Sequence, residues 1–283
     1  MNLNKALIMF ALFWVSCGTD QDTDKLVTIT TRLGDIKLVL FEDTPMHKES
    51  FLELAEEGAY DSTTFYRVIN NFMIQGGDVA LHQEFEQESL RLIPAEISPN
   101  HIHAKGMIGA ARQGANVNPE KNSSTQFYIV HGEVFSHEEL TTDINKLNNA
   151  FSKYINDGEH DELLKYCTVL QDSGQIDALQ DLIIEMRPEL EADMDMDFEN
   201  TEITPAQIDA YTTIGGAPHL DGGYTVFGKV VEGMETVDKI AALEVDDTDN
   251  PLETVLMTLK IEEYPKDSIT AWYGIEYPKT EDN

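Results

Sequence analysis

The stretch Thr63–Asp78, TTFYRVINNFMIQGGD, governs the interpretation of the whole chain. It opens with β-branched and aromatic residues, which favour a strand, and it closes on Gly76-Gly77, where the backbone can turn sharply or approach a ligand. Arg67 stands among apolar neighbours and is followed by the pair Phe72-Met73. The stretch therefore offers a permanent cation, an apolar surface and, at Gln75, an amide that can hydrogen-bond to a polypeptide backbone.

Two later stretches extend this pattern. Gly109-Ala110-Ala111-Arg112 is followed by SSTQFYI at Ser123–Ile129, and Leu220–Val230 reads LDGGYTVFGKV. With Thr63–Asp78, and in this order, these stretches closely resemble the cyclophilin family of peptidyl-prolyl cis/trans isomerases. With their flanks they cover residues 26–132 and 215–265.

The resemblance implies a mainly β fold, an eight-stranded antiparallel barrel capped by two helices, into which this chain is expected to insert a helical segment. Periodicity along the chain indicates matching elements. Thr44-Pro45 is a typical helix start, with Thr44 expected to cap it. The expected strands are Val27–Thr31, Ile36–Phe41, Ile93–Ile97, Gln126–Val130 and Leu252–Ile261, and Met234–Leu243 is the second expected helix.

Residues 133–214 differ from their surroundings in charge and periodicity. They contain 20 Asp or Glu and 4 Lys or Arg, and 20 minus 4 leaves a net charge of −16. Apolar residues recur at helical spacing in four runs, the third broken near Pro188 and the fourth starting at Thr204-Pro205. We expect an acidic helical insertion beside the substrate groove, which either selects protein clients or decorates the fold.

The N-terminus resembles a bacterial lipoprotein signal peptide over residues 1–16. A lysine precedes an apolar run of about ten residues, Ala6–Val15, which is too short to span a bilayer. Cleavage would leave Cys17 for lipidation and residues 17–25 as an acidic tether, so the expected location is the bacterial envelope, periplasmic or surface-exposed. An ordinary cleaved signal is the alternative, since Trp14 stands where such signals usually carry Leu.

Composition excludes several functions. The formal net charge of −33 would repel nucleic acid phosphates, so we expect no nucleic acid partner. No nucleotide-cradling glycine loop is present, and no cofactor or metal is expected.

Cys167, the second of two cysteines, lies on an apolar helical face and is expected to be a buried, unreactive thiol. We expect a monomer whose tail, residues 266–283, has no assigned structure.

Two patterns leave a cation site open as an alternative. His101 and His103 would share a face of a strand, but with no third ligand in sight a solvated loop is the preferred interpretation. Met194–Asp197 reads as an exposed acidic linker without the spacing of an EF-hand. A cation-binding protein built on the acidic insertion is therefore the third and weakest functional hypothesis.

The resemblance implies a catalytic chemistry that needs no nucleophile, base or metal. Rotation about an X–Pro bond removes amide resonance, and the prolyl nitrogen gains a lone pair that accepts a hydrogen bond. A donor aimed at that nitrogen binds the transition state better than either ground state. Arg67 matches this role, while Gln75 and Gln126 match positions that orient the arginine and hold the substrate backbone.

The same resemblance implies the substrate-binding residues. The expected set is Phe72, Met73, Ala111, Arg112, Tyr128, His219, Leu220 and Tyr224. Ala111 and Arg112 match a segment whose backbone pairs with the residue before proline. Three positions depart from many relatives: Arg112 replaces Asn, Tyr224 replaces His, and His219 replaces a Trp important for cyclosporin. Weak cyclosporin binding is expected.

The sequence thus predicts an isomerase that acts on proline-containing peptides and unfolded clients during envelope protein folding. The alternative is a lipid-anchored module that binds proline-containing segments without useful turnover.

Overall fold

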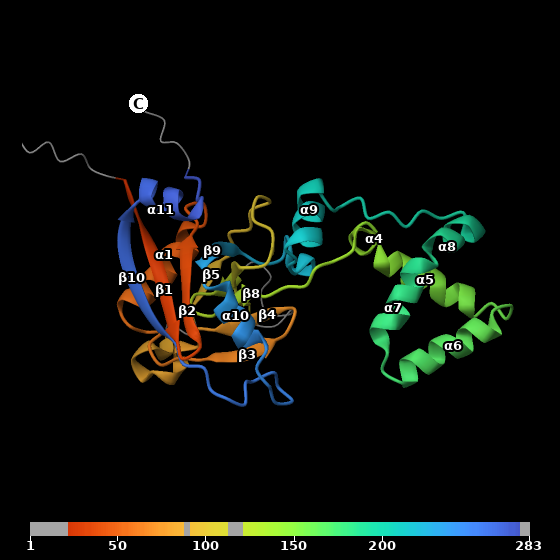
Figure 1. The fold of residues 1–283 in the computed structure, drawn as a ribbon, viewed down its shortest axis with the longest axis horizontal. Helices are drawn as coiled ribbons and strands as arrows, with labels where there is room; N and C mark the ends of the chain where they lie inside the picture. Colours follow the sequence, from red (N-terminus) through yellow and green to blue (C-terminus); the bar gives the residue numbers. More distant parts are fainter. Residues whose placement is uncertain (1–21, 88–90, 113–120, 278–283) are drawn as a thin grey trace, which may run out of the picture. The chain divides into compact units, whose positions relative to one another are not determined.

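The computed structural model describes residues 22–87, 91–112 and 121–277 (Figure 1). The chain divides into two compact units. The larger unit is Leu26–Glu262, and the smaller combines Met1–Lys25 with Glu263–Asn283. The predicted signal peptide and Cys17 lie outside the described residues. No helix in the part of the chain that the structure describes is long and apolar enough to cross a membrane.

Eight strands form one curled antiparallel sheet, in the order β10-β1-β2-β9-β6-β8-β4-β3. The segment that leads into β3 and the first residue of that strand form backbone hydrogen bonds with the segment before β10: Met257 N donates to Thr63 O (2.9 Å) and Phe65 N to Val255 O (3.1 Å). These bonds link the two edges of the sheet, and the expected eight-stranded architecture is confirmed. The strands are β1 (Thr23–Thr31), β2 (Gly34–Leu40), β3 (Phe65–Ile69), β4 (Met73–Gly76), β6 (Met107–Ala110), β8 (Phe127–Val130), β9 (Val226–Glu232) and β10 (Thr258–Pro265).

The last strand begins later than predicted. The expected strand Leu252–Ile261 overlaps β10, but its first half joins the sheet only through isolated contacts such as the bridge between Thr64 and Leu256. The predicted hairpin at the N-terminus is confirmed, with Ile29 opposite Ile36 and Val27 opposite Leu38.

Two helices contribute apolar side chains to the barrel core. Phe51 and Leu54 of α1 (Pro45–Glu56) and Val237 and Ile240 of α10 (Met234–Ala241) join one buried cluster with the inward side chains of the strands. Phe51 lies 5.4 Å from Phe127 between ring centroids. Burying one such ring stabilises the fold by about 1.5–3 kcal/mol, so both predicted helices are held by the barrel.

The predicted cap of α1 is wrong in its chemistry. Thr44 occupies the N-cap position, but its side chain makes no capping bond. The Glu96 carboxylate accepts hydrogen bonds from Met46 N (3.1 Å) and His47 N (3.0 Å) instead. A negative charge at a helix N-terminus is favourable, and it satisfies amides that have no partner within the helix.

A second, two-stranded sheet pairs β5 (Leu92–Pro94) with β7 (Lys121–Ser123). Pro94 lies in β5, and both strands of a two-stranded sheet are edge strands, which agrees with the expected edge position of this proline. β7 corrects the expectation of a continuous loop over Gln113–Ser124, of which residues 113–120 lie outside the described part. The 3₁₀ turns are Val79–Leu81, Gln83–Phe85 and Pro218–Leu220.

The acidic segment is helical, as predicted. Its helices are α4 (His137–Leu140), α5 (Ile144–Ile155), α6 (Asp161–Asp172), α7 (Ile176–Glu185), α8 (Arg187–Met194) and α9 (Pro205–Thr213). The first predicted stripe divides into α4 and α5 because the Asp143 carboxylate accepts from Lys146 N and starts a new helix. Pro188 stands in the first turn of α8, where its missing N–H is harmless.

The helices of the 133–214 segment have a hydrophobic core of their own. Leu147, Phe151, Cys167, Leu190 and Phe198 are among its buried members. Cys167 is a free, buried cysteine, and burial raises the pKa of its thiol, which agrees with an unreactive role.

The smaller unit contains an unpredicted helix, α11 (Lys266–Tyr273). Lys266 Nζ lies 3.0 Å from Asp22 Oδ1, and Tyr277 Oη donates to Asp24 (2.9 Å).

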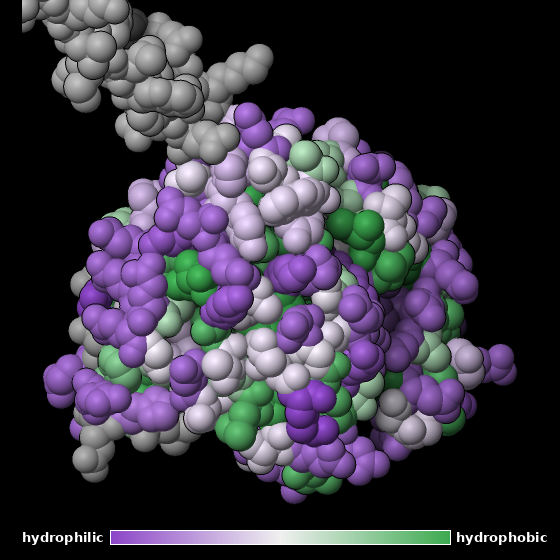
Figure 2. Space-filling view, turned by 60° about the vertical axis from the view of Figure 1, so that its left-hand side comes forward, coloured by the Kyte–Doolittle hydropathy of each residue, from purple (hydrophilic) through white to green (hydrophobic). Residues whose placement is uncertain are grey.

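Hydrophilic side chains dominate the face of the molecule seen in Figure 2, with apolar side chains scattered between them. That distribution fits the strong net negative charge.

Candidate active site

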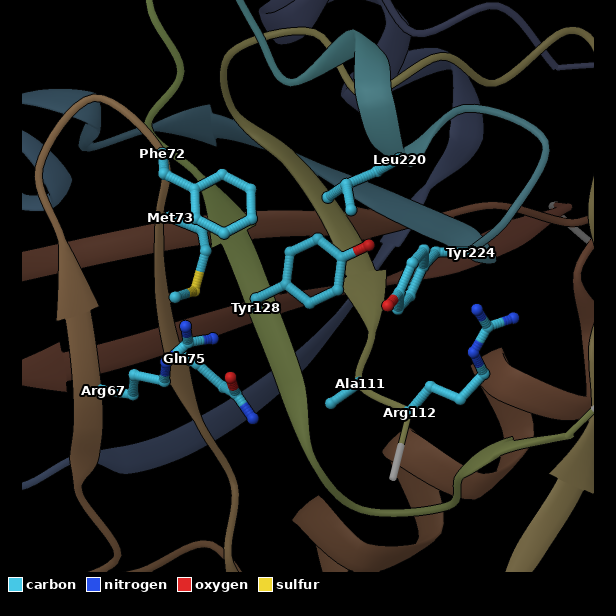
Figure 3. A pocket seen from close by; sticks show the side chains of 9 residues that line it. All are labelled: Arg67, Phe72, Met73, Gln75, Ala111, Arg112, Tyr128, Leu220 and Tyr224. Carbon is cyan, nitrogen blue, oxygen red and sulfur yellow. The ribbon is translucent and has the colours of Figure 1, made fainter. Parts of the chain in front are cut away.

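One pocket of about 100 Å³ gathers nine of the eleven predicted site residues (Figure 3). Tyr128 lies at its centre, with Phe72 and Met73 on one side and Leu220 and Tyr224 on the other. The complete lining is Arg67, Phe72, Met73, Gln75, Ala111, Arg112, Tyr128, Leu220 and Tyr224. Gln126 and His219 lie beside the pocket and are not part of its lining.

Strand register places the polar groups in one row. Arg67 on β3 pairs with Gln75 on β4, Gln75 pairs with Tyr128 on β8, and Tyr128 pairs with Gly109 on β6. Residues directly opposite in a sheet project from the same face, so these four positions line one surface. Gly109 leaves room for the ring of Tyr128, because a Cβ there would lie 2.2 Å from the ring carbon Cζ.

Apolar residues form the floor and one wall. Met73, Tyr128 and Leu220 are buried in a small cluster, against which Phe72 and Tyr224 pack. Met73 is 2% and Tyr128 5% exposed, so a ring entering the pocket would meet a dry surface that is already ordered. Such a surface suits a small apolar ring.

Arg67 is held from outside the pocket by an acidic loop. Its Nε lies 3.3 Å from Asp249 Oδ2, and both side chains are 41% exposed. Asp249 adopts a left-handed backbone (φ 63°), and its carbonyl accepts from Val68 N at 2.8 Å. The Asp246 carboxylate accepts from Thr248 and Asn250 in the same loop, and these bonds lower its pKa. The loop thus orders the carboxylate that faces the guanidinium.

A tyrosine that sequence analysis missed connects the two predicted glutamines. Gln75 Nε2 donates to Tyr66 Oη (2.5 Å), and Tyr66 Oη donates to Gln126 Oε1 (2.9 Å). Burial, with the nearby Asp78 charge, raises the pKa of Tyr66 to about 12, so the phenol stays neutral. Gln126 therefore faces Tyr66 at the edge of the site.

A buried histidine holds the central tyrosine, which corrects the predicted solvated loop at His101 and His103. His103 is fully buried, with Nε2 2.9 Å from Tyr128 Oη and Nδ1 2.8 Å from Asp221 Oδ1. Asp221 Oδ2 accepts from Tyr211 Oη (2.6 Å) and Gln207 Nε2 (2.8 Å) on α9. Burial opposes ionisation of Asp221, but the hydrogen bonds from these neighbours outweigh it and lower its pKa. The 133–214 segment is thereby hydrogen-bonded, through α9, to the Asp221–His103 pair that contacts Tyr128.

His101 has a different environment. Its ring stacks on Phe41, and Nε2 lies 2.7 Å from Asp43. Within the described ranges no group of three His, Cys, Asp or Glu side chains could hold a metal ion.

The opposite rim is built on Tyr224. The guanidinium of Arg112 lies 4.4 Å from the centre of the Tyr224 ring and donates to Gly223 O (2.7 Å). Ala111 N donates to Gln126 O (2.9 Å), and Ala111 O accepts from Ser123 N (2.8 Å). The N–H and C=O of Ala111 are therefore both used inside the protein, and the expected pairing of the Ala111-Arg112 segment with substrate backbone stays a prediction.

His219 lies on the far side of Phe72. The two ring centroids are 5.0 Å apart, and the imidazole borders a second hollow instead of the first. Burial is the main cause that lowers the pKa of His219. A neutral imidazole thus backs the Phe72 wall at neutral pH.

Comparisons with known proteins agree with this geometry. The family model "Cyclophilin type peptidyl-prolyl cis-trans isomerase/CLD" matches residues 26–167 and 198–261. A Staphylococcus aureus (strain USA300) protein named "Putative peptidyl-prolyl cis-trans isomerase" is 28% identical over 246 residues, which are 86% of this chain and 94% of the relative. A Staphylococcus epidermidis protein of the same name is 27% identical with the same coverage.

A solved structure supports the fold alone. The crystal structure of a cyclophilin-type peptidyl-prolyl cis-trans isomerase from Cryptosporidium parvum aligns with a TM-score of 0.50 and 19% identity. The alignment covers 86% of this chain and 100% of the other.

Proposed function

Because the chain belongs to the cyclophilin-type peptidyl-prolyl cis-trans isomerase family, we propose that it accelerates X–Pro rotation by a hydrogen bond from Arg67 to the prolyl nitrogen. The observation that carries this proposal is the position of Arg67, which lines the same pocket as the buried apolar residues Met73 and Tyr128. A proline ring seated on those residues would bring its nitrogen near the guanidinium.

The hydrogen bond is worth most in the transition state. In the planar ground state the prolyl nitrogen is a poor acceptor, because its lone pair is delocalised into the carbonyl. At the twisted geometry the lone pair is localised and accepts from a charged donor, a type of bond worth about 1.5–3 kcal/mol net. That energy is gained only during rotation, so it lowers the barrier and does not merely tighten binding.

The pocket also has to hold one side of the bond still. Tyr128 is fixed by His103, and Met73 and Leu220 are buried, so the apolar surface is rigid before substrate arrives. The amides of Gln75 and Gln126, oriented by Tyr66, supply donors and acceptors for the substrate backbone. One half of the substrate is then held while the other half turns.

We further propose that the enzyme assists folding of envelope proteins while anchored through a lipid on Cys17. This rests on the N-terminal sequence, Ala6–Val15 followed by Ser16-Cys17-Gly18. Metabolic labelling with palmitate in a bacterial host tests it: labelling should be lost in Cys17→Ser. Equal labelling of both proteins, or of neither, would contradict the anchor.

A protease-coupled assay on a short proline peptide tests the catalytic role. Arg67→Ala should lower kcat/KM about 10- to 150-fold, the equivalent of the lost charged hydrogen bond. Arg32→Ala is the matched control, because it removes the same charge from an exposed pair with Glu253. An inactive wild-type protein that still binds the peptide would favour the non-catalytic binding module instead.

A further inference from the structure

A second hollow lies directly behind one wall of the proposed active site. Its volume is about 350 Å³, and His219 and Pro218 form the side nearest the active site. Since the His219 ring lies 5.0 Å from the Phe72 ring, a polypeptide leaving the first pocket over Phe72 would reach the second within a few residues. At about 3.3 Å per extended residue, this places the second hollow about two to four residues from the proline.

The lining of this hollow is mainly apolar and comes from the insertion. Phe135, Leu140, Ile144, Ile184 and Ile203 supply the apolar side chains. Leu140 is buried, and the others are partly exposed, so apolar area remains available to a ligand. A single leucine or isoleucine side chain placed there would be removed from water.

Hydrogen bonds hold the segments before and after α4, which form walls of the hollow. Phe135 N donates to Tyr211 O (3.0 Å), which joins the segment before α4 to α9. Asn200 Nδ2 donates to Leu140 O (3.0 Å), and Arg187 Nη1 donates to Thr142 Oγ1 (2.9 Å). The hollow is therefore built by ordered contacts, and α4 stands at its centre.

The charge of the segment that forms the hollow is mainly acidic. Glu139 is part of the lining, and burial, together with the charges of Glu139 and Asp177, raises the pKa of Glu133. Arg187 beside Thr142 contributes one positive charge, but the 133–214 segment that supplies most of the lining carries a net charge of −16 (20 acidic minus 4 basic residues), so the hollow lies in an acidic segment. A lysine or arginine next to the bound apolar side chain would be attracted, and an acidic one repelled.

We propose that this hollow is an extended subsite that binds the client polypeptide, taking an apolar side chain flanked by Lys or Arg two to four residues from the isomerised proline. The inference rests on the proposed function and names its substrate class: basic, apolar segments of unfolded protein. The insertion then acts as a specificity element for the isomerase pocket.

Peptides of matched length test the subsite. In one series the Leu-Lys pair lies two to four residues after the proline, and in the second series it lies two to four residues before the proline. Each series also includes a peptide with Leu→Ser and a peptide with Lys→Glu. In one of the series, Leu-Lys should raise kcat/KM about tenfold over the Leu→Ser peptide. The Lys→Glu peptide should lose a further two- to fivefold at low salt, and less at high salt.

Variants locate the effect. Ile203→Ser and Ile184→Ser should abolish the preference for Leu-Lys while leaving turnover of a short tetrapeptide unchanged. Ile176→Ser is the control, because Ile176 is an exposed isoleucine of α7 that does not line the hollow. A Leu-Lys preference that is absent in both series, or that survives in both subsite variants, would overturn the proposal.

Direct binding separates this proposal from the proposed function. Fluorescence anisotropy with the labelled Leu-Lys peptide should show weaker binding to Ile203→Ser even if the wild type proves catalytically inactive. An inactive enzyme with subsite-dependent binding would refute only the isomerase mechanism, whereas active enzyme with subsite-independent binding would refute only the subsite. Sedimentation showing a dimer that Ile203→Ser dissociates would assign the hollow to a second copy of the chain and overturn the proposal.

Discussion

Asp249→Asn is the most informative change outside the pocket, because it alters the partner of Arg67 without touching the pocket lining. Asp249 Oδ2 lies 3.3 Å from Arg67 Nε and leaves the other two guanidinium nitrogens for the substrate. Asparagine tolerates the left-handed backbone found there (φ 63°), so the loop should be retained. Only the charge that fixes the guanidinium plane is removed.

The expected size follows from the exposure of the pair. Both side chains are 41% exposed, so solvent screens the attraction. Exposed ion pairs of this kind are worth about 0.2–1 kcal/mol. If that energy orients Arg67 in the transition state, kcat should fall about 1.4- to 5-fold, since 1.4 kcal/mol corresponds to a factor of ten.

Stopped-flow protease-coupled kinetics at low and high salt provide the assay. The deficit of Asp249→Asn should shrink in 1 M salt, because salt already weakens the wild-type pair. Asp247→Asn is the control, since it removes an equal charge from an exposed position of the same loop. A deficit equal in both variants, or one that does not depend on salt, would refute a positioning role for Asp249.

Three further predictions concern buried groups. Tyr128→Phe removes the hydroxyl that lies 2.9 Å from His103 Nε2, so urea denaturation should show a loss of about 1–3 kcal/mol in the free energy of unfolding, and no loss would refute the bond. Gly109→Ala should lower kcat/KM at least tenfold, because the added Cβ would displace Tyr128 into the pocket; normal turnover would contradict this. Burial lowers the pKa of His47 in the folded protein, although Glu96 opposes the shift. The neutral His47 should therefore contribute fully to the free energy of unfolding above about pH 6.5, and this contribution should decline as the pH falls toward the lowered pKa of the folded state. His47→Gln should flatten that decline, and an unchanged dependence of the free energy of unfolding on pH would contradict the assignment.

The residues that the sequence could locate are those whose neighbours are near in the chain or adjacent in register. Arg67 and Gln75 belong to one hairpin, and the alternation of strands brings Tyr128 beside them. The helices of the 133–214 segment were likewise predictable, because apolar spacing and caps such as Thr204-Pro205 are local signals.

The residues that sequence reasoning missed depend on distant partners. Asp249 is 182 positions from Arg67, and Asp221 is 118 positions from His103. No local pattern distinguishes a histidine that will be buried between a carboxylate and a phenol from one in a loop. Glu96 replaced the expected cap of α1 for the same reason, because its partners are 49 and 50 positions away.

Tyr66 has a consequence for the polarity of the site. A phenol carries a single proton, and here it points to Gln126 while the oxygen accepts from Gln75. The carbonyl end of Gln75 and the NH₂ end of Gln126 are left to face outward. The single hydroxyl of Tyr66 therefore fixes the orientation of both amides, so that Gln75 in the pocket lining is left with an acceptor and Gln126 beside the pocket is left with a donor.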